Sequence, residues 1–150
     1  MKKGMKFLIL AAALSVAPAL SGADLSGRFG IGVNWPGIQI RYGITDNIVA
    51  EGRVQFAANN LTVGGRAYYH LMEIPGTVPV IPYVGGGFDW VVSNVLRGGY
   101  LTGGFAGAEL MLTDNISIGG DAGLYWADIW YDQHYADWGL IFNAGLTYYF

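Results

Sequence analysis

Apolar and aromatic side chains alternate with small or polar ones through most of the chain after residue 24. The clearest case is Trp138–Phe150, where every second residue is apolar or aromatic. A period of two is the pattern of a β-strand with two unlike faces. Seven further stretches share this period, and turn residues separate them. We predict eight strands, at Leu25–Trp35, Ile38–Ile44, Ile48–Phe56, Leu61–Leu71, Ile81–Val92, Gly99–Leu112, Ile116–Ala127 and Trp138–Phe150.

Ionised side chains fall on only one of the two faces of these strands. No Asp, Glu, Lys or Arg shares the apolar face, although in the two glycine-rich central strands the charges helped to choose the faces. The charged face balances four arginines against four acids, which indicates ion pairing in an enclosed space. An eight-stranded barrel has an interior that side chains can just fill. We therefore predict a plugged lumen with an ion-pair network of Arg28, Arg41, Glu51, Arg53, Arg66, Asp89, Glu109 and Asp121.

The apolar face indicates a membrane. Trp138–Phe150 exceeds the usual strand of about 5–6 residues and suits a tilted bilayer span, which needs about 9–11. Strands cross lipid only as a closed barrel, since unpaired backbone groups are costly in hydrocarbon. Aromatic residues near the strand ends are typical of the interfacial girdles of such barrels. The fold class that we predict is all-β: an eight-stranded antiparallel up-and-down transmembrane β-barrel.

Composition narrows the class of protein further. The chain has 150 residues, is 53% hydrophobic and contains no cysteine, which excludes disulfide scaffolds and thiolate metal sites. Residues 1–23 have the features of an export signal: three lysines, an apolar stretch and a small-residue cleavage site. Residues 24–150 would form the barrel. Loss of the three lysines would take the net charge from −3 to −6, which argues against nucleic acid as a partner.

Several motifs resemble those of the small outer-membrane β-barrel superfamily of Gram-negative bacteria, the OmpA/OmpX/OmpW-like barrels. The motifs are Pro82–Phe88, Gly104–Leu110, Leu112–Ser117 and the aromatic end Tyr148-Tyr149-Phe150. The resemblance implies localisation in the cell outer membrane and an assembly signal at Tyr148 and Phe150, read by the barrel-assembly machinery. The chain differs from several members of that superfamily in having no long exposed loops and no peptidoglycan-binding domain.

Catalysis has little support in this sequence. Some barrels of the resembled superfamily trim acyl chains from lipid A with a Ser, a His and an acid, and a triad needs a hydroxyl within reach of the imidazole. His134 has no Ser or Thr beside it, and His70 fits a polar rim residue. We expect no enzyme activity, no cofactor and no metal site. A lipid A deacylase-like enzyme stays as one alternative, and a soluble lipocalin-like carrier in the periplasm as another.

The longest predicted connection, Asp128–Asp137, is rich in acidic and aromatic residues. It could extend the aromatic collar, or it could contact lipopolysaccharide through divalent cations or a protein through exposed aromatics. The contact residues that we predict are Asp128, Trp130, Tyr131, Asp132, His134, Tyr135 and Asp137. The expected function is a structural or surface-interaction role for a monomer among outer-membrane lipids and lipopolysaccharide, with at most a very narrow pore.

Overall fold

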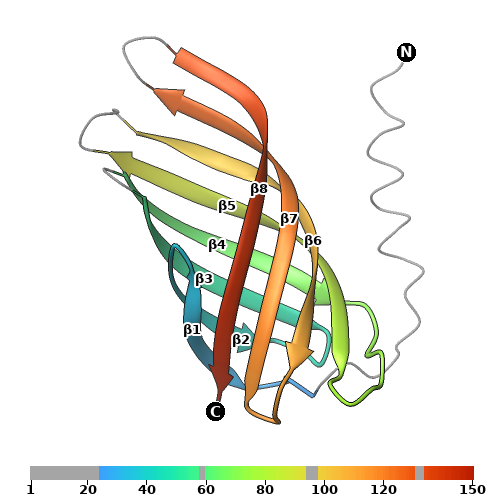
Figure 1. Ribbon diagram of the computed structural model, residues 1–150. Coiled ribbons are helices and arrows are strands. Elements are labelled where there is room, and N and C mark those ends of the chain that lie inside the picture. The colour runs from blue at the N-terminus through green and yellow to red at the C-terminus, as the bar shows by residue number, and fades with distance from the viewer. Residues whose placement is uncertain (1–23, 58–59, 94–97, 131–133) are drawn as a thin grey trace, which may run out of the picture.

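The chain folds into one closed sheet. A computed structural model describes residues 24–57, 60–93, 98–130 and 134–150. Within these ranges eight strands form a barrel (Figure 1), and no helix is long and apolar enough to cross a membrane. The strands are β1 (Phe29–Trp35), β2 (Gly37–Gly43), β3 (Ile48–Ala57), β4 (Asn60–His70), β5 (Val80–Ser93), β6 (Gly98–Met111), β7 (Ile116–Trp130) and β8 (His134–Tyr149).

Each strand pairs antiparallel with its neighbours in sequence, and β1 pairs with β8 to close the sheet. The closing register runs from Gly30 opposite Tyr149 to Trp35 opposite Ala144. Since closure leaves no free edge along this seam, backbone groups of both strands find partners there. The prediction of an eight-stranded antiparallel up-and-down barrel is confirmed at this level.

The two faces of the wall differ as the alternation predicts. Large apolar side chains such as Ile31, Ile40 and Leu146 lie on the outer face and are about half exposed, while Glu51 and Arg53 lie inside and are buried. Inward glycines leave room for long polar side chains. The interior is thus ionic and the exterior apolar, the reverse of an ordinary water-soluble domain.

The start of β1 differs from the prediction. Leu25 was predicted to begin the first strand, with its side chain on the outer face. Instead β1 begins at Phe29, and Leu25 is fully buried inside the barrel. Gly27 adopts a φ of 73°, which favours glycine and interrupts the extended chain. Alternation alone could not show this reversal, because a turn shifts the parity of the residues that precede it.

The predicted loop Asp128–Asp137 is also wrong. β7 continues to Trp130 and β8 begins at His134, and their register pairs Asp128 with Ala136 and Trp130 with His134. Figure 1 shows this hairpin extending past the other strands at the upper end of the barrel. The polar residues that suggested a loop are accommodated because they lie beyond the enclosed part of the sheet. Tyr131 and Asp132 lie outside the described residues.

The seam register predicts which engineered disulfide can form. Val33 and Leu146 are directly opposite across β1 and β8, and both side chains point outward. Oxidation of the Val33→Cys, Leu146→Cys double variant should therefore give an intramolecular crosslink, seen as a mobility change that reductant reverses. The control pair Val33→Cys, Thr147→Cys places the thiols on opposite faces and should not crosslink. Equal crosslinking of the two pairs would contradict the register.

Candidate functional site

The interior of the barrel holds an ion-pair network, defined by Arg41, Arg53, Arg66 and the four acids Glu51, Asp89, Glu109 and Asp121. Near the end where β8 terminates, Arg41 of β2 lies between two carboxylates. Its Nε is 3.0 Å from Glu51 Oε2, and its Nη1 is 2.9 Å from Glu109 Oε1. Because Glu51 lies on β3 and Glu109 on β6, one guanidinium ties two separate parts of the wall across the lumen.

Arg66 of β4 forms the next contact along the lumen. Its Nη2 lies 2.7 Å from Asp121 Oδ2, and its Nη1 lies 3.7 Å from Glu51 Oε1. The guanidinium also lies 3.6 Å from the centre of the Phe105 ring, a favourable cation–π arrangement. Arg66 therefore links β3, β6 and β7.

Arg53 of β3 makes the shortest ion pair. Its Nη2 and Nε bond to the two oxygens of Asp89 at 2.5 and 2.8 Å, a bidentate geometry. Its Nη1 also donates to Asn143 Oδ1 at 3.3 Å, and the amide of Asn143 donates to Asp121 at 2.8 Å. Asn143 thus joins the Arg53 pair to the Arg66 pair.

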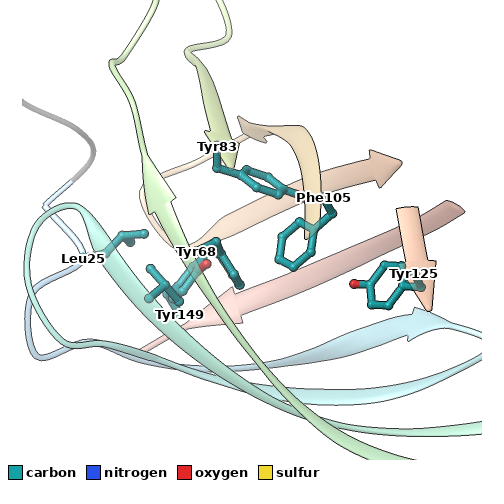
Figure 2. Close-up of a cluster of buried hydrophobic side chains, with 7 residues drawn as sticks. Leu25, Tyr68, Tyr83, Phe105, Tyr125 and Tyr149 are labelled. Atoms are coloured by element: carbon teal, nitrogen blue, oxygen red, sulfur yellow. The ribbon is translucent and has the colours of Figure 1, made fainter. Parts of the chain in front are cut away.

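Hydroxyl groups donate further hydrogen bonds to three of the four acids. Tyr68 donates to Glu51 at 3.1 Å and Tyr83 donates to Asp121 at 3.2 Å. Glu109 accepts from Tyr149 at 3.0 Å and from the hydroxyl of Ser117. The rings of these tyrosines pack with Phe105 as a buried aromatic cluster, shown in Figure 2. Polar tips and apolar rings together fill the lumen.

The structure brings seven of the eight predicted network residues together and leaves one out. Arg28 lies before β1, is partly exposed, and donates to the backbone carbonyls of Asp114 and Phe150 at 2.8 and 3.4 Å. No Asp or Glu carboxylate among the described residues forms a salt bridge with it. The prediction that Arg28 belongs to the lumen network is wrong, because the turn at Gly27 holds it at the rim.

His70 was assigned to the rim but lies in the interior. It is fully buried, and its Nε2 lies 3.4 Å from Glu109 Oε2. The sequence did place His70 on the inward face of its strand. Parity gives the face of a residue but not its depth, so the contact with Glu109 on β6 could be found only from the pairing registers of the intervening strands.

Among the described side chains, no arrangement resembles a hydrolytic triad. His134 Nε2 lies 2.7 Å from Asp128 Oδ1, but no Ser or Thr hydroxyl in that part of the chain bonds to the imidazole. Ser117 and His70 both contact Glu109, yet this order places the acid between hydroxyl and base, and all three are fully buried. A triad needs the base between the other two groups. The described residues also contain no cluster of three or more metal-ligating side chains.

The five predicted contact residues that the structure describes, Asp128, Trp130, His134, Tyr135 and Asp137, lie on β7 and β8 rather than on a loop. Asp128 accepts from the hydroxyl of Tyr100 at 3.2 Å and contacts His134, so it follows the outward face of Trp126 and Trp130. It is therefore an acid on the outward parity, which the sequence interpretation had not expected. Tyr135 and Asp137 are exposed and bond to each other. The predicted assembly residues Tyr148 and Phe150 are exposed on the outer face.

Adjacent glycines give a matched test of the network. A Cβ at Gly64 would collide with the carboxylate of Asp89, whereas a Cβ at Gly65 would face outward, with its nearest contact 3.7 Å away. Gly64→Ala should therefore lower the free energy of unfolding by about 1–3 kcal/mol, the usual cost of overpacking. Gly65→Ala should leave it nearly unchanged. Urea titration of refolded protein measures both, and equal effects would contradict the packing described.

Comparisons with known proteins add no family. No family model, no curated protein and no solved structure matches this chain. The resemblance to small outer-membrane barrels therefore stays a prediction from the residues. The geometry itself establishes a closed eight-stranded antiparallel barrel with buried salt bridges in its interior.

Proposed function

We propose that this chain is an integral β-barrel of a bacterial outer membrane, with a plugged lumen and a structural or surface-interaction role. The observation that carries the proposal is the distribution of side chains across the wall. Large apolar residues cover the outer face of every strand, while the charged pairs are enclosed. Exposure of so much apolar surface to water is unfavourable, but contact with acyl chains removes the penalty.

Details of the outer surface support contact with lipid. A hollow of about 750 Å³ near the β1–β2 turn is lined by apolar groups, among them Val33, Ile38 and Leu146. A second hollow, of about 940 Å³, lies over small outward residues such as Gly86 and Gly104. Such hollows can hold the chains of surrounding lipids. Lipids and lipopolysaccharide are therefore the first partners that we propose.

The lumen supports a structural role more than a transport role. The side chain of Arg41 reaches from β2 to acids on β3 and β6, and Arg66 reaches from β4 to β7. A solute would have to separate these pairs, leaving buried charges without partners at a cost of several kcal/mol each. We therefore propose at most a very narrow pore. A carrier for apolar ligands would need an apolar interior, which is the opposite of this arrangement.

The projecting β7–β8 hairpin is the surface that we propose for contacts. Its outer face carries Trp126 and Trp138, whose ring centres are 5.4 Å apart, and Trp130 packs against Trp90 at 5.6 Å. From His134 to Leu140 both faces of β8 are exposed. Aromatic side chains are enriched where proteins meet partners and where membranes meet water. At the other end, Tyr148 and Phe150 are proposed as the signal that the assembly machinery reads.

A charge on the outer face distinguishes a membrane from water. Ile40 lies midway along β2 and is about half exposed. In a bilayer, Ile40→Arg should lower the free energy of unfolding by about 2–4 kcal/mol, because the charge faces hydrocarbon. The control Ile40→Leu keeps the apolar surface and should change little. Urea titration in phospholipid vesicles measures both variants.

The proposal also predicts the cell fraction in which the protein is found. When the protein is expressed with residues 1–23 in a Gram-negative host, it should fractionate with the outer membrane. It should also migrate differently on gels before and after boiling, because a closed barrel resists unfolding in detergent. Release by osmotic shock as a soluble monomer, with Ile40→Arg as stable as the parent, would overturn the membrane placement.

A further inference from the structure

The residues before β1 form a turn at one end of the barrel. Leu25 points into the interior and is fully buried. Two backbone hydrogen bonds fasten the turn to β2, from Gly27 N to Gly43 O at 2.8 Å and from Gly43 N to Arg28 O at 3.0 Å. A third bond, from Arg28 N to Leu25 O at 3.0 Å, closes the turn on itself. The segment is therefore fixed in place.

Leu25 lies in a space that Gly43 leaves in the barrel wall. Gly43 lacks a side chain where the backbone of Leu25 passes, and a Cβ there would collide with the Leu25 carbonyl. Leu25 belongs to the same buried cluster as Val49, Tyr68 and Tyr149, and Figure 2 shows it beside the last two. The surroundings of Leu25 are therefore apolar, and along the β2–β3 pair the ion pair of Arg41 and Glu51 lies one inward-facing position beyond Gly43 and Val49.

Arg28 fastens the turn to neighbouring segments at the same end of the barrel. Its guanidinium donates to the carbonyl of Asp114, in the β6–β7 turn, and to that of Phe150, after β8. It also lies 5.6 Å from the centre of the Tyr149 ring. One side chain thus ties the turn to the β6–β7 turn and to the end of β8, which gives Arg28 a role outside the ion-pair network.

We propose that Leu25 is an apolar seal of the lumen, separate from the ion-pair network, and that Arg28 latches the turn of residues 24–28 that carries it. Apolar constrictions exclude water and ions without any charge of their own. Tyr149, which packs in the same cluster as Leu25, donates to Glu109 at 3.0 Å, and Glu109 and the neighbouring His70 are fully buried. Excluding water there strengthens the ion pairs, since charges interact more strongly in a low dielectric. The inference concerns the barrel itself and does not depend on the membrane placement.

A single cysteine can report whether the seal is closed. The natural chain contains none, and Val49 is a fully buried apolar residue opposite Gly43 in the β2–β3 register. In Val49→Cys, a charged thiol reagent should react slowly while the seal is intact. Adding Leu25→Gly should raise the labelling rate by about tenfold or more, because the rate follows the population of open molecules. Adding Arg28→Gln should raise it as well, by loosening the latch.

Two controls separate opening of the seal from general unfolding. Phe105→Leu removes packing elsewhere in the same buried cluster and should leave the Val49→Cys thiol protected. Leu25→Met keeps an apolar side chain and should also preserve protection. The proposal would be overturned if the Val49→Cys thiol stayed protected after Leu25→Gly was added. It would also be overturned if the thiol reacted quickly in the Val49→Cys single variant, which keeps Leu25. Equal labelling in Phe105→Leu and Leu25→Gly would likewise overturn it, since the exposure would then come from a loosened barrel.

Discussion

Charges enclosed in a narrow lumen must find partners, and the rest of this structure depends on that constraint. A buried ion without a partner costs several kcal/mol, so each guanidinium is satisfied only when distant strands are brought together. Arg41 needs acids from β3 and β6, and Arg66 needs one from β7. A slip of one residue in any strand would turn its charges outward. The same pairs that satisfy the charges therefore fix the register of the closed sheet.

Because paired side chains fill the lumen, the function that we propose depends on the outer surfaces of the barrel. The interior is filled by paired side chains and tyrosine rings, and Leu25 packs against these rings at one end. The outer wall carries apolar side chains, and the β7–β8 hairpin carries exposed aromatics beyond the other strands. Under the membrane placement that we propose, the apolar wall would contact lipid and the projecting hairpin would serve the proposed structural or surface-interaction role.

Much of the architecture follows from alternation alone, because a period of two fixes the face of each residue. The number of strands, their antiparallel order and the inward position of Glu51 and Arg53 were all predictable from the sequence. The turn at Gly27 was not, so Leu25 and Arg28 were assigned to the wrong places. The depth of His70 depends on registers summed over several strands, which no local pattern records. The polar residues after Trp126 resembled a loop, because pairing beyond the enclosed barrel does not require an apolar face.

A double-mutant cycle on Arg53 and Asp89 tests the dependence on charge pairing most directly. Their bidentate contact is the shortest in the network, and the replacements Arg53→Met and Asp89→Leu keep the interior filled. Each single variant leaves one buried charge without a partner and should lower the free energy of unfolding by about 3–5 kcal/mol. The double variant should lose much less than the sum of the two. Small, additive losses would contradict the account, because the barrel would then be held closed without the ion pairs.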